Sequence, residues 1–289
     1  MGQNFHHQPS GTGHGRSQVK VGIFVDVAYM YRNGGRGLRY DVLREFAGRD
    51  QAELLRMNAY VSFDAERAQE DEEYRDGVHK FYSTLRDYGF KVIKKLVKWY
   101  EDDNGNRYGK ANADLDLGVD ALLQADNLDR VLIATGDGDF IQVVRALQNK
   151  GCRVETVALD NVSTELRYEV DMFMSGYLIP NLIPTKGGNS GPLWGELGSR
   201  VRGTCYWYNR EQGFGFMRFM DKIAPGLWLT DTRHPLSPYK TVYFHDSNLA
   251  ENIPTSQLPS REFIFEFELG KSIRQEGWQA LDIEIVSRL

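Results

Sequence analysis

Apolar residues gather in short runs along the first part of the chain, and amphipathic segments separate these runs. The runs span residues 19–27, 54–63, 90–100, 130–135 and 153–159. Between them, the spacing of apolar residues predicts helices over 41–47, 65–89, 113–125 and 139–151. Strands that alternate with helices predict an α/β fold, in which a parallel sheet carries helices on both faces.

The pattern changes near Pro184. Residues 184–199 are rich in glycine, proline and serine, which predicts a flexible linker. Residues 200–289 carry short alternating segments with many glycines and aromatic residues, which predict a small all-β barrel. Residues 1–17 offer almost nothing to bury, and we expect a disordered tail. The α/β domain then spans 18–183, and the linker tethers the barrel to it without a rigid interface.

Composition narrows the class of protein. The 289 residues are 41% hydrophobic and carry a net charge of −5. The charge is uneven, since residues 200–289 hold eleven Lys and Arg against eleven Asp and Glu. The chain contains two cysteines, no signal-peptide pattern and no apolar run of about 18 residues. We therefore expect a cytoplasmic protein without a disulfide framework or a membrane segment.

Four aspartates stand where a parallel sheet places its chemistry. Asp26 ends the first apolar run, Asp137 and Asp139 follow the fourth, and Asp114 opens the helix before the fourth. The carboxyl ends of parallel strands meet at one edge of a sheet, so these carboxylates are expected to converge and repel. A divalent cation removes the repulsion, and hard oxygen ligands suit Mg²⁺ or Mn²⁺. Such a site can activate water toward a phosphodiester.

Simpler explanations exist for some of these acids. Asp139 can be the N-cap of the helix behind it, and Asp137 can belong to a turn. Asp116 is expected on the surface, whereas Asp120 can support the ligands from behind. The chain has no phosphate-binding P-loop, no dinucleotide-binding glycine pattern and no zinc-ligand spacing.

The segments "VGIFVDVAYMY", "KANADLDLGVDAL" and "ATGDGDFIQVVRALQNKGCRVETVAL" resemble the NYN domain, a branch of the PIN-like nucleases, over residues 18–182. The resemblance implies metal-dependent RNA cleavage, with the four aspartates as catalytic residues and metal ligands. It also implies that Thr135 supplies a small hydroxyl beside the site and that Lys110 is the lysine before the helix aspartate. Many members have asparagine where this chain has Tyr29.

The segments "QGFGFM", "VYFHD", "YWYN" and "FIFEFELG" resemble a cold-shock domain over residues 200–286, which implies an OB-type barrel. Stacking of single-stranded bases is expected on one face of it, made by Trp207, Phe214, Phe216, Tyr243 and His245. The other explanation for these rings is a core stripe. Gly213 and Gly215 favour the open face, because they leave the opposite side bare. Gln212, Asp246 and an insertion over 221–240 depart from the family pattern.

Cations near the acidic site are expected to admit a polyanion. The candidates are Lys94, Lys98, Arg107 and Lys110, of which Lys94 and Lys98 share one face of the third predicted strand. A solvated strand edge explains the lysines equally well.

The sequence therefore predicts an Mg²⁺- or Mn²⁺-dependent ribonuclease that cuts single-stranded RNA, with single-stranded DNA as the other substrate to consider. The cold-shock-like barrel would present the strand. The alternative is a catalytically silent RNA-binding regulator that uses the same pocket for docking.

Overall fold

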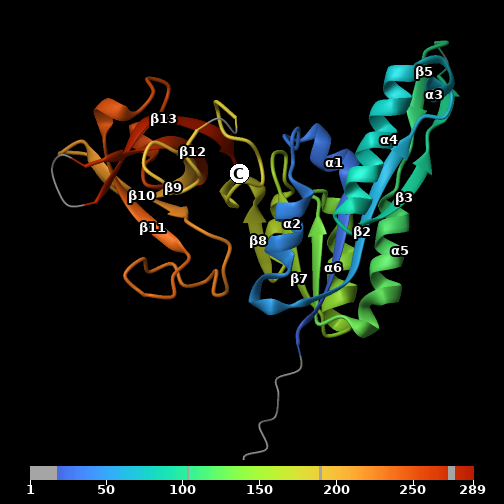
Figure 1. Ribbon diagram of the computed structural model, residues 1–289, viewed down its shortest axis with the longest axis horizontal. Helices are drawn as coiled ribbons and strands as arrows, with labels where there is room; N and C mark the ends of the chain where they lie inside the picture. The colour runs from blue at the N-terminus through green and yellow to red at the C-terminus, as the bar shows by residue number, and fades with distance from the viewer. Residues whose placement is uncertain (1–17, 103, 189–190, 273–276) are drawn as a thin grey trace, which may run out of the picture.

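The computed structural model describes residues 18–102, 104–188, 191–272 and 277–289. It shows an α/β sheet domain beside a closed β-barrel (Figure 1). The predicted tail over residues 1–17 lies outside the described residues. In the part of the chain that is described, no helix is both long and apolar enough to cross a membrane.

The α/β domain is built on a parallel sheet, which has six strands within the described residues, in the order β3-β2-β1-β6-β7-β8. These strands are β1 (Lys20–Asp26), β2 (Glu53–Phe63), β3 (Lys91–Leu96), β6 (Arg130–Ala134), β7 (Arg153–Ala158) and β8 (Met172–Ser175). The predicted fold class is thus confirmed. The sequence pattern does not predict β8, because four residues are too few to establish alternation.

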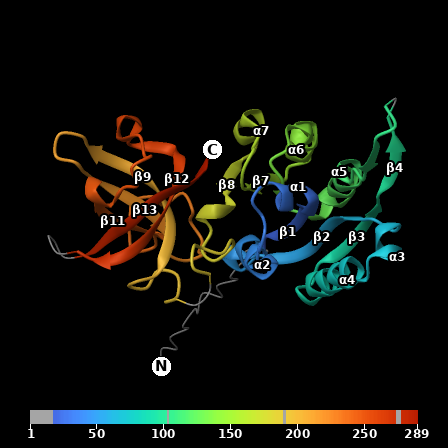
Figure 2. The same cartoon turned by 90° about the horizontal axis from the view of Figure 1, so that it is seen from above.

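Helices cover both faces of the sheet (Figure 2). One face carries α2 (Tyr40–Ala47) and α4 (Glu72–Asp87), and the other carries α5 (Asp114–Gln124), α6 (Ile141–Asn149) and α7 (Thr164–Glu169). Side chains alternate along β1, so Ile23 and Val25 belong to the apolar cluster of α2, while Phe24 belongs to that of α5 and α6. Helices on both faces of the sheet therefore hold β1 in place, including its carboxyl end.

Three helices differ from the sequence prediction, and one of them is α7, which the pattern of apolar residues does not predict. An unpredicted helix, α1 (Val27–Arg32), directly follows β1 because the carboxylate of Asp26 accepts a hydrogen bond from the Tyr29 N–H at 2.9 Å. The single helix predicted over 65–89 is interrupted, so α3 (Arg67–Glu70) precedes α4. Asp71 separates them, because its carboxylate caps α4 by accepting from the Tyr74 N–H at 2.8 Å.

The third predicted strand is also divided. Its first half is β3, whereas β4 (Lys98–Glu101) leaves the main sheet and pairs antiparallel with β5 (Arg107–Lys110). This hairpin confirms the turn signal at Asn104 and Gly105, and it projects from the domain in Figure 1. The expectation that Lys94 and Lys98 share a strand face is consequently wrong, since they lie in separate sheets.

The second unit is a closed barrel with five strands among the described residues, in the order β10-β11-β13-β12-β9. The strands are β9 (Arg200–Asn209), β10 (Phe214–Met220), β11 (Tyr239–His245), β12 (Ser260–Lys271) and β13 (Trp278–Arg288). Inward-facing aromatic and aliphatic side chains fill it, among them Phe219, Phe244 and Phe265. The predicted small barrel is present, and its cold-shock identity stays a prediction.

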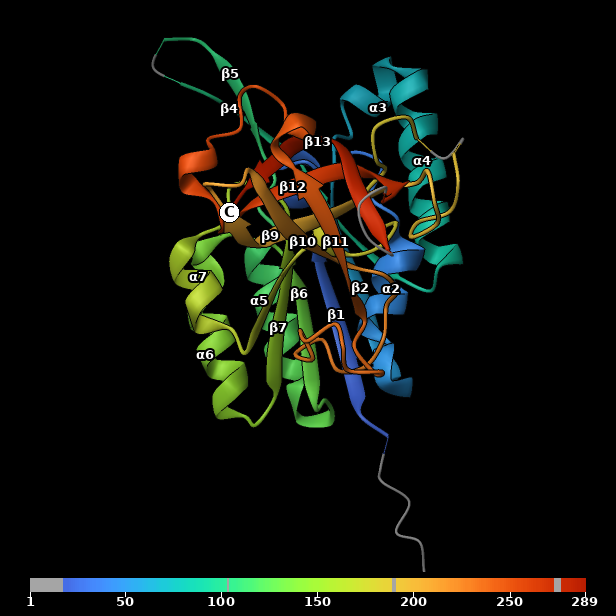
Figure 3. The same cartoon turned by 90° about the vertical axis from the view of Figure 1, so that its left-hand side faces the viewer.

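The barrel packs directly against the α/β domain, beside β8 and α2 (Figures 2 and 3). Met220, Leu227 and Ile264 of the barrel are buried in the same apolar cluster as residues of β1 and α2. Ser287 donates a hydrogen bond to Oδ1 of Asp160 across the interface at 2.8 Å. The expectation of a barrel without a rigid interface is therefore wrong, because burial of these side chains couples the two units.

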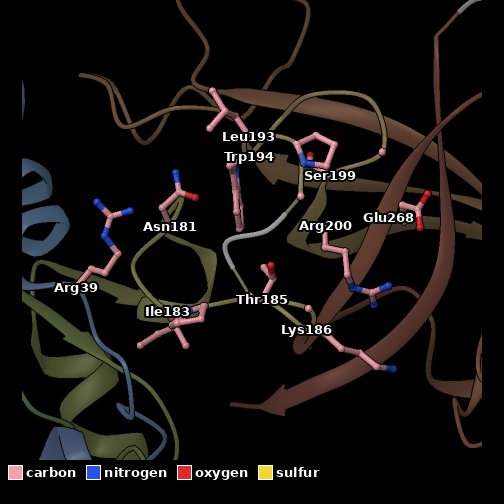
Figure 4. A pocket seen from close by; sticks show the side chains of 16 residues that line it. Arg39, Asn181, Ile183, Thr185, Lys186, Leu193, Trp194, Ser199, Arg200 and Glu268 are labelled. Atoms are coloured by element: carbon pink, nitrogen blue, oxygen red, sulfur yellow. The ribbon is translucent and has the colours of Figure 1, made fainter.

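Arg202 ties the start of the linker to the barrel. Its guanidinium donates to Glu266 at 2.8 Å and to the carbonyl oxygens of Ile183 at 3.0 Å and Pro184 at 2.6 Å. It also lies 5.4 Å from the ring centroid of Tyr177. Beside this junction, linker residues and side chains of both domains enclose a cavity of about 520 Å³ (Figure 4).

Candidate functional site: an acidic mouth and an aromatic face

Three of the four predicted aspartates line one cavity, which we call the acidic mouth. Asp26 closes β1, Asp137 follows β6, and Asp114 begins α5. β1 and β6 are parallel neighbours, so both strands end at the same edge of the sheet. The mouth occupies about 260 Å³ and also includes Tyr29, which the sequence comparison singled out, and three side chains that sequence reasoning missed: Arg32, Asn112 and Tyr60.

The turn after β6 is built by its own small residues. The Asp137 carboxylate accepts from the Asp139 N–H at 3.0 Å, and the buried Thr135 hydroxyl accepts from the Asp137 N–H at 3.4 Å. A Cβ on Gly136 would lie 2.3 Å from the hydroxyl oxygen of Tyr29, so a side chain there would displace the tyrosine ring. Asp139 is exposed and does not line the mouth, although its charge helps to raise the pKa of Asp114.

Burial and mutual repulsion disfavour charge on these carboxyl groups. The pKa of Asp26 rises to about 6, first because the group is buried and then because Asp114 and Asp137 are near, although the Tyr29 N–H and Arg32 oppose the rise. Burial and Asp137 also raise the pKa of Asp114. Acids perturbed in this way gather where a protein binds cations or does chemistry.

The chemistry of the donor set fits a hard divalent cation. Carboxylate oxygens from three elements face a polar cavity, and Mg²⁺ and Mn²⁺ prefer such ligands. Across the described ranges, however, no group of three Asp, Glu, His or Cys side chains is arranged to hold a metal ion. The predicted four-aspartate ligand set therefore stays a prediction.

Tyr29 forms part of the wall of the mouth. Its hydroxyl donates to the carbonyl oxygens of Asp160 at 3.1 Å and Asn161 at 2.7 Å. Burial, with the nearby Asp137, raises the pKa of Tyr29 to about 12, so the phenol stays neutral and keeps these bonds. The tyrosine thereby joins the acidic mouth to the loop that contacts the barrel through Asp160.

Two other acids on α5 take different positions. The carboxylate of Asp120 accepts a hydrogen bond at 2.8 Å from the hydroxyl of Tyr60, whose side chain lines the mouth. Asp120 therefore supports the wall from behind. Asp116 pairs at 2.7 Å with Lys95, in agreement with its predicted surface role.

The predicted cations do not line the mouth, as far as their side chains are described. Lys94 lies 5.2 Å from the ring centroid of Tyr82, and Arg107 is paired with Glu66. Lys98 is exposed on the hairpin, and the side chain of Lys110 lies outside the described part of the structure.

The cation that does line the mouth is Arg32, at the end of α1. Within the described residues it forms no ion pair. Its position follows from α1, which turns the chain back over the end of β1. Arg32 could have been placed in the mouth from the sequence only if a helix had been predicted after Asp26. The apolar pattern there is too short to predict a helix.

The barrel carries an aromatic face made by Trp207, Phe214, Phe216, Tyr243 and His245, which Tyr206 extends. Its rings touch one another, with centroid separations of 5.3 Å for Trp207 and Phe214 and 5.7 Å for Phe214 and Tyr243. Trp207 and Tyr206 are 41% and 42% exposed, whereas Tyr243 is buried. The predicted residues thus lie together, and the outward half of β10 is not a core stripe.

The expectation that glycines create this face by leaving the opposite side of the strand bare is wrong for Gly215. Gly215 does not leave the opposite side of β10 bare, because a Cβ there would lie 2.5 Å from the ring of Phe244. The glycine makes room for a core ring, while Phe214 and Phe216 point outward by alternation. Asp246 is engaged as well, since its carboxylate accepts a hydrogen bond from the Tyr208 hydroxyl at 2.8 Å.

A family model for the NYN domain matches residues 20–179, more than half of the chain. The chain belongs to the NYN domain family. This places it in the PIN-like nuclease superfamily. Low amplitude and bright protein LabA of Synechococcus elongatus is similar to this chain, with 29% identity over 161 residues. That alignment covers 54% of this chain and 82% of LabA.

Two solved structures are also similar in part. A Vibrio parahaemolyticus protein of unknown function is 25% identical, with a TM-score of 0.44, covering 56% of this chain and 94% of its own. Phosphofructokinase-2 from Escherichia coli is 15% identical, with a TM-score of 0.23, covering 50% and 52% of the two chains.

Proposed function

We propose that this chain is an Mg²⁺- or Mn²⁺-dependent ribonuclease that hydrolyses phosphodiester bonds of single-stranded RNA at the acidic mouth of its NYN domain. The observation that carries the proposal is the cavity shared by Asp26, Asp114 and Asp137, in which the pKa of Asp26 rises to about 6. Carboxyl groups held in this unfavourable state gain most from a bound cation. Membership of the PIN-like superfamily supports the same chemistry.

Residues in and beside the mouth have distinct roles under this proposal. The three lining aspartates, with Asp139 beside them, would hold the ion, which when bound supplies an activated water and stabilises charge on the phosphate. Arg32 binds a phosphate oxygen, because a free guanidinium at the rim forms charge-assisted hydrogen bonds. Thr135 holds the backbone of Asp137 in place.

The barrel supplies affinity for the strand. Exposed and half-exposed rings on the aromatic face stack with bases irrespective of sequence, since every base has a flat face. The barrel has no net charge, so phosphate attraction contributes little to its binding. Its packing against the NYN domain holds both surfaces on one rigid body.

A second function competes with this one. Tyr29 stands where many NYN domains have asparagine, and the described acids are not grouped to hold a metal ion. These two features favour a catalytically silent regulatory protein. Such a protein would bind single-stranded RNA, with the acidic mouth as a docking surface, and leave the RNA intact.

Titration of Mn²⁺ into the protein with a labelled single-stranded RNA separates the two functions. We expect cleavage by the wild type and a loss of roughly a hundredfold or more in Asp137→Asn. The amide retains the oxygen that caps the turn, so the variant should fold. The matched control is Asp87→Asn, at the exposed end of α4. Full activity in folded Asp137→Asn contradicts the proposed site, and binding without cleavage by the wild type favours the silent protein.

A further inference from the structure

A second cavity adjoins the acidic mouth, and we call it the aromatic cavity. It occupies about 470 Å³ between α1, the loop behind α1, the end of β2 and α4. Ala28 and Ser62 line both this cavity and the mouth, so the two cavities are direct neighbours there. In contrast to the mouth, its walls are apolar and aromatic, with rings from Tyr31, Tyr40, Tyr74, Phe81 and Tyr82.

The rings of the aromatic cavity are held in place. The hydroxyl of Tyr82 donates to the Ser62 carbonyl oxygen at 3.0 Å, and the hydroxyl of Tyr74 accepts from the Asp64 N–H at 3.2 Å. Tyr40 is buried against Phe81, with ring centroids 5.7 Å apart. A preformed, rigid cavity of this kind binds a flat ligand without the entropic cost of ordering its walls.

Besides the tyrosine hydroxyls, a polar group stands at the border with the mouth and positive groups stand near the entrance. In the described part of the chain, the Ser62 hydroxyl makes no hydrogen bond, and it lies where the two cavities meet. Arg36 stands 5.6 Å from the ring centroid of Tyr31, which is 58% exposed at the rim. Arg32 lines the mouth nearby. Neither arginine forms an ion pair within the described residues.

We propose that the aromatic cavity binds the nucleobase next to the phosphate that lies at the acidic mouth, an inference that rests on the proposed function. The two cavities match the two parts of one nucleotide. The mouth offers cations and cation-binding acids for the phosphate, and the aromatic cavity offers an apolar, ring-lined space for the base. The Ser62 hydroxyl is placed to bond a polar edge of that base. A base must be unpaired to enter, so the cavity selects single strands.

The occupant that competes with a nucleobase is an apolar side chain or an acyl chain. The two arginines at the entrance favour a ligand that carries negative charge beside its apolar part. The position of the cavity directly beside the acidic mouth also favours a ligand that reaches both cavities at once. A nucleotide within a strand meets both conditions.

The test combines a filled cavity with an abasic scan. Single-stranded RNA 8-mers, natural or with one abasic residue at each position in turn, are bound to Asp137→Asn protein, and their KM is measured with the active protein. We expect one abasic position to weaken binding roughly five- to a hundredfold. In Val78→Trp, which places a ring in the cavity, natural RNA should bind equally weakly and that position should lose its effect.

The matched control is Lys80→Trp, which adds the same ring to the exposed side of α4. Tyr31→Ala is the second variant, because its exposed side chain can be removed without disturbing the core. Thermal melting followed by circular dichroism checks that all variants fold.

The outcomes separate this proposal from the proposed function. An abasic penalty that persists in Val78→Trp and Tyr31→Ala, or a flat scan in a cleaving wild type, overturns the base site alone. A scan with one sensitive position in a protein that never cleaves overturns the nuclease and leaves the base site. Binding of the apolar dye 1-anilinonaphthalene-8-sulfonate that Val78→Trp abolishes, with a flat scan, assigns the cavity to an apolar ligand and overturns the proposal.

Discussion

Two features of the surroundings of Asp26 shift the pKa of its carboxyl group in opposite directions. As the N-cap of α1 it accepts a backbone hydrogen bond, which favours the ionised form. As a buried acid beside Asp114 and Asp137 it is held protonated to a higher pH than usual. The second effect is larger, so an ionised Asp26 weakens the fold at neutral pH when no cation is present.

We therefore expect Asp26→Asn to be more stable than the wild type at neutral pH. The pKa of Asp26 rises from 3.8 to about 6, so the native state holds more protons than the unfolded state between these values. Wild-type stability falls as pH rises through this window, and the loss is complete above it. The asparagine keeps the cap and lacks this loss. Urea unfolding in EDTA should show a gain of up to about 3 kcal/mol at pH 7.5, and none at pH 3.

The control for this measurement is Asp87→Asn, whose carboxylate is exposed. It should change stability little at either pH. A variant Asp26→Asn that is less stable than the wild type at pH 7.5 would show that the capping role outweighs the cost of the buried charge.

At the scale of single elements, β10 shows how one strand serves two surfaces. Alternation sends Phe214 and Phe216 outward, while Met217 and Phe219 enter the barrel core. Gly215 faces inward too, where the ring of Phe244 takes the space of a side chain. The outward rings are only half-buried and touch Trp207, so their removal leaves the core intact.

The double variant Phe214→Ala/Phe216→Ala tests what the aromatic face does. Loss of one stacked ring costs about 1–3 kcal/mol, so the KM for a long single strand should rise by roughly five- to a hundredfold. The kcat should barely change, because rings remote from the acids bind substrate and transition state alike. Steady-state cleavage of long and short RNA strands measures both constants.

Short strands that reach only the NYN domain should show no effect of the double variant. Tyr168→Ala, which removes an 86% exposed ring on α7, serves as the control and should leave both constants unchanged. An unaltered KM for long strands in the double variant would mean that the barrel does not present RNA and docks another molecule instead.

At the scale of the whole molecule, the two domains pack against each other and contribute side chains to one apolar cluster. Arg202 is 4% exposed and holds Glu266 together with two carbonyl oxygens at the start of the linker. Glu266 is itself buried and also accepts from Arg200 and from the Lys186 N–H. Removal of any one partner from a buried charged network of this kind destabilises the fold, because the remaining buried charges are left without a group of opposite charge.

We expect Arg202→Ala to uncouple the domains. The change leaves Glu266 partly uncompensated and two carbonyl oxygens without their donor, at a cost of about 3–5 kcal/mol. Differential scanning calorimetry should show one transition for the wild type and two for the variant. Arg210→Ala is the control, because this exposed arginine binds only the Ser256 carbonyl oxygen within the described residues. One unshifted transition in Arg202→Ala would contradict the coupling.

Local order along the chain was enough to predict the layers and the three aspartates that line the acidic mouth. Alternation and helical spacing predict five of the strands, and charged residues directly after buried strands predict Asp26 and Asp137, since parallel strands end at a common edge. The aromatic face follows from alternation along β10. These features depend on neighbours within a few residues, so the alternation of strands and the spacing of helices can be read directly from the sequence.

Only the tertiary structure decided the features that join distant segments. Arg32 enters the mouth because Asp26 caps an unexpected helix, and Asp139 lies outside the lining of the mouth, in the turn where its N–H donates to Asp137. The glycine-, proline- and serine-rich linker predicted a loose tether, yet Met220, Leu227 and Ile264 are buried against the other domain. The aromatic cavity likewise exists only where α1 and α4 approach over β2. Such contacts are set by the close packing of side chains far apart in sequence, which no local period encodes.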